Sequence, residues 1–162
     1  MARFDLVHEF PAMHVGVRVD AGRLAEICFL PRSIPLAAPS NRLAERTARQ
    51  FDRYLSDPDY RFSLPTAEVG SAFQRRVWDA ICKIPRGRTA TYGQVAKHIR
   101  SAPRAVGQAC GSNWFPLLVP CHRVVSSSGI GGFGHHGEGY HLEIKRWLLE
   151  HECDPARHGK LS

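Results

Sequence analysis

The 162-residue sequence has no long hydrophobic run, no CxxC pair and no recognisable export signal. Without a stretch of about 18 apolar residues, it contains no candidate for a membrane-spanning helix. Its first residues, Met1 to Asp5, do not resemble a secretory leader, so we expect an intracellular, cytoplasmic protein. Five cysteines without paired spacing are not the pattern of a small disulfide scaffold, and we expect them to be reduced thiols.

Acidic residues are too few to balance the basic ones. The sequence has 22 Lys and Arg against 15 Asp and Glu, which gives a net charge of +7 and a pI of about 9.5. A basic protein of this kind makes a polyanionic partner such as nucleic acid worth considering. The length suffices for one domain or two small ones with a hydrophobic core.

The amino-terminal part is predicted to form a small α/β module. Residues 13–19 alternate apolar and other side chains, and a turn at 20–22 precedes a second candidate strand at 23–29, so this segment indicates a β-hairpin. A helix follows, for which Ser40 is a plausible N-cap. Its apolar residues recur at helical spacing: Leu43, Thr47, Phe51 and Tyr54. A connector rich in Pro, Asp and Ser places the boundary near Pro65, giving domains 1–65 and 66–162.

The second domain carries helical patterns. Ser71-Ala72-Phe73-Gln74 and Thr91-Tyr92-Gly93-Gln94 have the form of capping boxes, which mark the start of a helix. A third helix is predicted from Arg104 to Gly111, after Ser101-Ala102-Pro103. Since two short helices are separated by a tight turn, this region suggests a helix-turn-helix.

The helix 104–111 is unusual because Gly and Ala replace the long side chains that normally read bases. Small residues allow a backbone to approach DNA closely, but they equally allow a helix to pack against the protein's own core. Arg104 places a cation at the end of a helix that favours an anion, so it needs an acid, a phosphate or a stacking partner. This requirement of Arg104 slightly favours DNA as the partner of the helix.

The run Pro120-Cys121-His122-Arg123-Val124-Val125 places a thiol beside an imidazole. A nearby base or cation activates a thiol by lowering its pKa from about 8.5. If the preceding apolar residues 117–119 are extended, Cys121 and His122 point to opposite faces, and a bridging water is favoured over direct contact. A buried cysteine beside a satisfied core histidine is the alternative.

Together these motifs resemble the O6-alkylguanine-DNA alkyltransferase family, also called methylated-DNA-protein-cysteine methyltransferases. The resemblance is close in the second half of the chain and looser before it. It implies an α+β fold, in which a small ribonuclease-H-like module precedes a mostly helical, winged-helix-like domain. The matching motifs occur in the family's order: Ile84-Pro85-Arg86-Gly87, Tyr92-Gly93-Gln94-Val95-Ala96, Arg104-Ala105-Val106-Gly107, Asn113, Pro120 to Val125, and Lys145-Arg146-Trp147-Leu148-Leu149-Glu150-His151-Glu152.

The activity that the resemblance implies is DNA repair by single-turnover transfer. An alkyl group would pass from O6-alkylguanine, and from O4-alkylthymine, in double-stranded DNA to Cys121 of a monomer, without a cofactor. His122 would activate the thiol through a water and would be oriented by Glu152. Tyr92 would donate a proton to the base, and Asn113 would brace the turn before the cysteine.

The resemblance also implies a DNA surface and a base pocket. Because the target atom is inaccessible inside a duplex, the nucleotide must be flipped out, and Arg104 would fill its place in the stack. The small helix would lie in the minor groove. The implied DNA contacts are Thr91, Tyr92, Arg104, Ala105 and Gly107. The implied pocket residues are Pro116, Val124, Gly132, Phe133, Gly134 and Lys145.

The sequence departs from the family pattern after Gly132. Gly132-Phe133-Gly134 lacks the Tyr and Ser hydroxyls that the family often has there, so we expect backbone donors of this loop to serve O6 instead. The loop from His135 to Tyr140 is longer than usual, which suggests a wider or more mobile pocket rim. His135, His136 and His141 could ligate a metal, but a solvated cluster in a Gly-rich loop is simpler, and we expect no metal.

Two other functions stay open at this stage. A cysteine hydrolase or transamidase would assemble Cys121, His122 and either Asn113 or Glu152 into an acyl-transfer triad and would turn over. A non-enzymatic lesion-binding protein would use only the helix-turn-helix. Relatives that merely bind lesions lack the reactive cysteine, whereas Cys121 is present here.

Overall fold

A computed structural model describes residues 3–131 and 140–153 of the chain. The chain divides into two compact units, Met1–Glu68 and Val69–Ser162. Two small sheets and five α-helices make up the described part, which is therefore mixed α/β. Among the helices described, none combines the length and the apolar character needed to cross a membrane.

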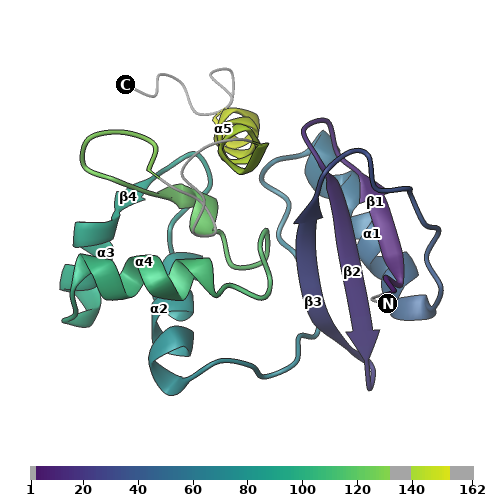
Figure 1. Cartoon of the computed structure of the whole chain (residues 1–162), viewed down its shortest axis with the longest axis horizontal. Coiled ribbons are helices and arrows are strands. Elements are labelled where there is room, and N and C mark those ends of the chain that lie inside the picture. The colour runs from purple at the N-terminus through teal and green to yellow at the C-terminus, as the bar shows by residue number, and fades with distance from the viewer. Residues whose placement is uncertain (1–2, 132–139, 154–162) are drawn as a thin grey trace. The chain divides into compact units, whose positions relative to one another are not determined.

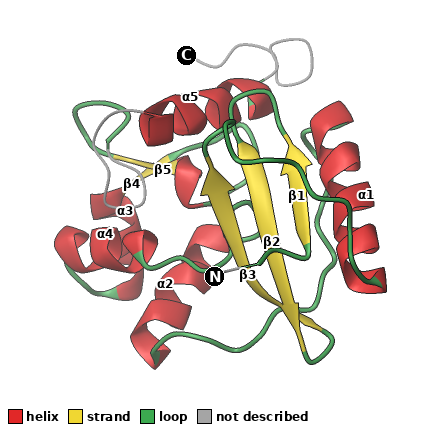
Figure 2. Ribbon diagram, turned by 45° about the vertical axis from the view of Figure 1, so that its right-hand side comes forward, coloured by secondary structure: helices red, strands yellow, loops and turns green. Residues whose placement is uncertain are grey.

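The first unit contains a three-stranded antiparallel sheet in the order β1 (Leu6–Glu9), β2 (His14–Asp20), β3 (Arg23–Leu30) (Figure 2). The predicted hairpin is confirmed as β2 and β3. Ala21 and Gly22 form its two-residue turn with φ of 52° and 75°. Positive φ at both positions matches the turn type whose twist suits a hairpin. Strand β1 was not predicted from the sequence.

Helix α1 (Arg42–Ser56) follows the sheet. Its N-cap is Asn41, whose side chain accepts a hydrogen bond from the backbone N–H of Ala44 at 2.8 Å. The prediction of Ser40 as the cap is therefore wrong, because the Ser40 hydroxyl instead donates to the Asp5 carboxylate at 2.7 Å. The predicted apolar face is correct: Thr47, Phe51 and Tyr54 are buried.

The second unit has four of the helices: α2 (Ala72–Cys82), α3 (Tyr92–Ile99), α4 (Pro103–Gly111) and α5 (Tyr140–Glu152). Both predicted capping boxes are confirmed, at Ser71 for α2 and at Thr91 for α3. Arg100 ends α3 in the left-handed conformation, with φ of 59°, and α4 starts three residues later. This tight turn sets α3 and α4 side by side (Figure 1).

One contact joins the start of α3 to the segment that contains Cys121, and another joins the end of α4 to α2. Strand β4 (Ala90–Thr91) pairs in parallel with β5 (Val124–Val125), which follows the cysteine directly. The Trp78 indole N–H of α2 donates to the carbonyl of Ala109 at 2.9 Å and fixes the last turn of α4. The start of α3 is therefore held beside the Cys121 segment, and the end of α4 is held against α2.

Candidate active site

The Cys121 segment is a succession of turns. Leu117 has a φ of 81°, so residues 117–119 are not an extended strand. Pro120, with φ of −81° and ψ of 65°, is the centre of an inverse γ-turn that the Cys121 N–H closes on the Val119 carbonyl at 2.8 Å. A 3-10 turn over Cys121–Arg123 follows. Proline suits this position because its ring fixes φ near that value.

Asn113 braces these turns and contacts the thiol. Its Nδ2 donates to the Val119 carbonyl at 2.8 Å and to Cys121 Sγ at 3.3 Å, and its Oδ1 accepts from the Phe115 N–H at 2.9 Å. One side chain thus satisfies two backbone groups and points a donor at the sulfur. The predicted bracing position of Asn113 agrees with this geometry.

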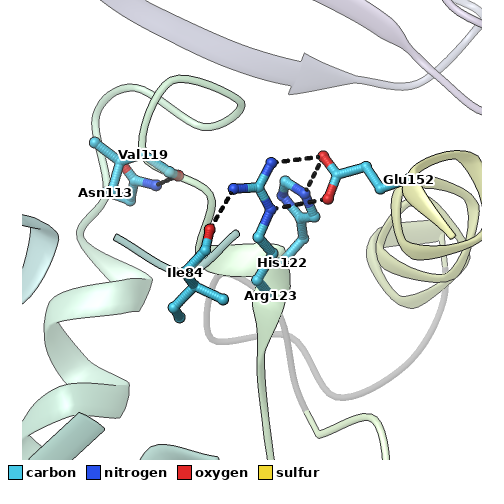
Figure 3. Close-up of polar contacts among 6 residues, drawn as sticks. All are labelled: Ile84, Asn113, Val119, His122, Arg123 and Glu152. Carbon is cyan, nitrogen blue, oxygen red and sulfur yellow. Dashed lines mark hydrogen bonds and ion pairs between the residues drawn. The ribbon is translucent and has the colours of Figure 1, made fainter. Parts of the chain in front are cut away.

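His122 and Arg123 both bind Glu152 at the end of α5 (Figure 3). His122 Nε2 lies 2.8 Å from Glu152 Oε2, and the Arg123 guanidinium donates to both carboxylate oxygens at 2.8 and 3.0 Å. Arg123 also donates to the Ile84 carbonyl at 2.8 Å. An ionised carboxylate only accepts hydrogen bonds, so Nε2 carries the hydrogen and the lone pair of neutral His122 is on Nδ1.

Burial and charged neighbours together set the ionisation of His122 and Glu152. His122 and Glu152 have side chains only 1% exposed. Burial lowers the pKa of His122, and Glu152 only partly offsets this. Burial alone would raise the pKa of Glu152, but His122 and Arg123 outweigh it and hold that pKa well below its usual range. His122 therefore rests as a neutral base beside a carboxylate that orients it.

Opposing contacts act on the Cys121 thiol. A hydrogen bond with the Cys110 side chain, followed by burial, raises the pKa of Cys121 well above its ordinary value. The Asn113 side chain acts in the other direction. In the described part of the chain, no hydrogen bond joins Cys121 directly to His122. At rest the thiol is therefore protonated, and it can be ionised only if its proton is removed through another group.

Tyr92 and Lys145 are two further ionisable groups of the site. Lys145 is fully buried, its ammonium donates to the Val124 carbonyl at 2.8 Å, and it lies 5.9 Å from the centre of the Tyr92 ring. Burial lowers the pKa of Lys145 to about 8 and raises the pKa of Tyr92 to about 12. Both pKa values are also shifted by Cys110 and Cys121, so all four groups share one neighbourhood.

The α3–α4 surface carries the residues expected to meet DNA. Arg104 is exposed in the first turn of α4, and Gly107 lies one turn further along the same helix. A β-carbon at Gly107 would lie 4.0 Å from the Tyr92 ring, an ordinary contact. Residues 69–162 contain 13 Lys and Arg against six Asp and Glu, whereas residues 1–68 contain nine of each. The whole net charge thus belongs to the second unit.

The structure describes some of the other predicted site residues, whereas the rest lie outside the described part of the chain. Thr91 caps α3, and Ala105 is half-buried in α4. Pro116 forms an isolated β-bridge with Val119, just before the cysteine turn. Val124 is buried, and its carbonyl accepts a hydrogen bond from Lys145. The remaining predicted residues lie outside the described part: Gly132, Phe133, Gly134, and His135 and His136 of the considered metal cluster.

The family profile described as "6-O-methylguanine DNA methyltransferase, DNA binding domain" matches residues 72–154, which is half of the chain and includes every residue of this site. The chain belongs to the 6-O-methylguanine DNA methyltransferase family. A methylated-DNA--protein-cysteine methyltransferase of Methanosarcina barkeri is 38% identical over 121 residues, covering 73% of each chain. A probable methyltransferase of the same name from Acanthamoeba polyphaga mimivirus is 45% identical over 96 residues, 58% of this chain and 61% of that protein.

Solved structures of methyltransferase family members have the same fold. The Mycobacterium tuberculosis O6-methylguanine methyltransferase superposes with a TM-score of 0.76 at 30% identity, over 91% of this chain and 90% of that one. A structure of the M. tuberculosis protein in complex with DNA gives 0.74 at 31% identity, over 91% of each. The chain spans 58% to 65% of the length of three of the curated methyltransferases that it matches.

The influence of Cys110 on the Cys121 thiol was not predicted from the sequence. Cys110 is on the buried face of α4 with Val106 and Ala109, and this spacing signals helix packing. Nothing in the spacing signals a second thiol at the site. Arg123 contacts an acid, Glu152, and the backbone carbonyl of Ile84, so it ties the cysteine turn to two other segments.

Proposed function

We propose that this methyltransferase family member repairs DNA by moving an alkyl group from guanine O6 to Cys121 in a single turnover. The observation that carries the proposal is a buried thiol with a directed donor, Asn113, beside the buried pair of His122 and Glu152. The curated relatives are named as methyltransferases that use a protein cysteine, which supports the same acceptor.

The proposed activation moves a proton from sulfur to the imidazole. A water between Cys121 and His122 would pass the proton to Nδ1, because Nε2 is committed to Glu152. The imidazolium so formed is stabilised by the Glu152 carboxylate. Arg123 holds that carboxylate in place by two hydrogen bonds, so it positions the relay without touching the thiol.

The transfer step is one displacement. The Cys121 thiolate attacks the saturated carbon attached to O6, the new C–S bond forms as the C–O6 bond breaks, and the electron pair stays on the base. A proton delivered to the base ring by Tyr92 would make guanine a better leaving group. Burial raises the pKa of Tyr92 to about 12, so its hydroxyl carries the proton that this step requires. The thioether on Cys121 is stable, so each chain would react once.

We also propose how the DNA is held. The α3–α4 pair with β4 and β5 would act as a winged-helix-like unit, with α4 in the minor groove and its small residues against the backbone. Exposed Arg104 would replace the flipped nucleotide. The charge excess of residues 69–162 supports a phosphate-binding role, and a family structure is known in complex with DNA.

The remaining proposals concern the protein as a whole. Residues 66–162 would form the DNA-binding and alkyl-acceptor domain, and residues 1–65 a ribonuclease-H-like module. We propose that the protein acts as a monomer, without cofactor or metal. All five cysteines are free thiols, which supports a reducing compartment such as the cytoplasm. Substrates would include O4-alkylthymine as well as O6-alkylguanine.

The experiment that tests this function is a count of transferred groups. The purified chain is incubated with an excess of duplex DNA that contains one radiolabelled O6-methylguanine. We expect at most one methyl group per chain, located on Cys121 by peptide mass spectrometry, and none on Cys121→Ala. Repeated turnover would instead support a cysteine hydrolase, and activity without Cys121 would overturn the assignment of Cys121 as the acceptor. In that class the nucleophile and base share a hydrogen bond, which the described part of this site lacks.

A further inference from the structure

The second unit has a cavity of about 330 Å³ where the end of α2, the turn 85–88 and one face of α3 meet. Its lining includes two cations and, among the described residues, no acidic one. The polar side chains at this cavity are all exposed: Lys83, Arg88, Thr89, Gln94 and His98. In the described part of the chain, no residue of α4 or of the His122 relay lines the cavity, so it is separate from the site described above.

The acceptor groups around this cavity are already used, whereas its donors are open. Three backbone carbonyls of the lining accept hydrogen bonds from the protein: those of Ala80, Ile84 and Pro85. The Gln94 side-chain oxygen accepts from the Thr91 N–H at 2.8 Å in the capping box, which leaves the Gln94 amide nitrogen as a donor. A ligand of this cavity therefore meets mainly hydrogen-bond donors.

The two cations have no counter-charge of their own. In the described part of the chain, neither the Lys83 ammonium nor the Arg88 guanidinium forms a hydrogen bond or an ion pair. Arg88 also borders a neighbouring cavity that contains Glu150, but no ion pair joins these two described residues. The Arg88 N–H closes the turn 85–88 on the Pro85 carbonyl at 3.1 Å, and Gly87 has the positive φ, 82°, that the third residue of a type II turn requires. The turn thus fixes the backbone from which the Arg88 side chain extends.

The charge of the surrounding sequence identifies the class of ligand. From residue 80 to residue 137 the chain contains seven Lys and Arg and no Asp or Glu. A surface of one sign of charge attracts a polyanion. The edge of a nucleobase presents donors as well as acceptors, whereas a phosphate presents only acceptor oxygens and carries a negative charge, which Lys and Arg bind by charge-assisted hydrogen bonds. The donors and charge of this cavity therefore fit a phosphate.

We propose that this cavity binds one backbone phosphate of the DNA, at a nucleotide beyond those that α4 meets. The assignment rests on the proposed DNA binding and extends that surface along α3 to the end of α2. The two surfaces are continuous, because Ala90 lines the cavity and the next residue, Thr91, is an expected DNA contact. Lys83 and Arg88 supply the charge, and the Gln94 amide is a neutral donor. A phosphate contact positions a protein on the duplex without reading its sequence, which suits a search for lesions in any sequence.

The first arm of the test measures how the affinity for an unmodified fluorescent duplex depends on salt, by anisotropy with the full chain. Loss of one phosphate contact lowers the slope of log K against log salt by about 0.9. The affinity advantage of wild type over Lys83→Ala/Arg88→Ala should therefore shrink about 3.5-fold between about 50 and 200 mM KCl. The control Lys97→Ala/Arg146→Ala removes one Lys and one Arg from exposed positions of the same unit outside the cavity, and it should keep the wild-type slope.

The second arm locates the phosphate. Each phosphate of a duplex with one central O6-methylguanine is replaced in turn by an uncharged methylphosphonate. We expect one replacement that weakens the binding of wild type and of the control variant but does not weaken Lys83→Ala/Arg88→Ala further. The exchange Lys83→Arg/Arg88→Lys keeps both charges and should remain sensitive to that replacement.

The proposal is overturned if the two alanine double variants lose the same slope, or if no methylphosphonate distinguishes them. Calorimetric binding of inorganic phosphate, with the DNA slope unchanged in Lys83→Ala/Arg88→Ala, would indicate a site for a free anion and would also overturn it. Neither arm needs alkyl transfer. If wild type binds the duplex but transfers nothing to Cys121, the proposed chemistry fails while both arms still decide the phosphate site. If wild type does not bind DNA, the phosphate site is overturned together with the DNA-binding role.

Discussion

Replacing Asn113 by Ala is expected to slow alkyl transfer by raising the pKa of Cys121. The amide donor at 3.3 Å is the group that favours the thiolate. A hydrogen bond to a charged group contributes about 1.5–3 kcal/mol, which corresponds to roughly a 10- to 150-fold change in an equilibrium. The fraction of Cys121 present as thiolate should then fall roughly 10- to 150-fold at neutral pH.

The rate should fall less than the thiolate fraction does. A thiolate of higher pKa is intrinsically more nucleophilic, and a Brønsted coefficient of about 0.4–0.5 recovers nearly half of the logarithmic loss. We therefore expect single-turnover transfer to slow by about 4- to 15-fold. Loss of the Asn113 side chain also leaves the Phe115 N–H and the Val119 carbonyl without their partner, so stability should drop by about 1–3 kcal/mol.

The assay combines the transfer rate with the pH dependence of iodoacetamide labelling at Cys121, which reports the thiol pKa directly. Asn41→Ala is the control, because it removes the α1 cap and costs about 1 kcal/mol in a unit without site residues. The control should leave the thiol pKa and the transfer rate unchanged. Slower transfer in Asn113→Ala with an unaltered thiol pKa would refute the donor role and leave Asn113 as a structural brace only.

Three other predictions concern the relay and the DNA surface. Glu152→Gln should destabilise the protein by about 3–5 kcal/mol in urea unfolding, because it leaves Arg123 buried without its charge partner. The same change should slow alkyl transfer. The control Glu150→Gln, at an exposed position of the same helix, should change neither stability nor transfer. Wild-type stability should fall as the pH drops below about 6.5, since the lowered pKa of His122 means that the unfolded chain takes up a proton first. It should fall again below about 4.3, where the unfolded Glu152 is protonated before the folded one. A urea midpoint that stays constant from about pH 7 to 5 would contradict the shift of His122, and one that shows no further fall from about pH 5 to 3 would contradict that of Glu152. Arg104→Ala should impair transfer from duplex DNA far more than from free benzylguanine, and equal losses on the two substrates would exclude its role in flipping.

Local sequence signals predicted the elements that depend on local interactions. The two capping boxes and the β2–β3 hairpin are each closed by residues within a few positions of one another, so their residue types suffice to identify them. Strand β1 escaped because four residues give little alternation, and it is a strand only through its pairing with β2. The Ser40 cap failed because Asp5, far away in sequence, competes for that hydroxyl.

The site shows the same division between local and distant contacts. The Cys121-His122 pair is visible in the sequence, but the partner of His122 is 30 residues away, and only the family resemblance pointed to Glu152. The contact of Cys110 with Cys121 depends on how the end of α4 meets a series of turns. Neither spacing nor resemblance carries that information, since the contact is a product of tertiary packing.

The thiol contacts explain how an acceptor that works once can be both stable and reactive. Burial and Cys110 keep Cys121 protonated at rest, and a protonated thiol reacts slowly with alkylating agents and oxidants. Asn113 and the neutral His122 favour the opposite state, but the relay has no direct bond to the sulfur in the described part of the site. The thiolate would therefore form only when an intermediary such as the proposed water carries the proton from the sulfur to Nδ1 of His122. In that arrangement Cys110 helps to keep Cys121 protonated before the reaction, and the relay to His122 determines when the thiol loses its proton.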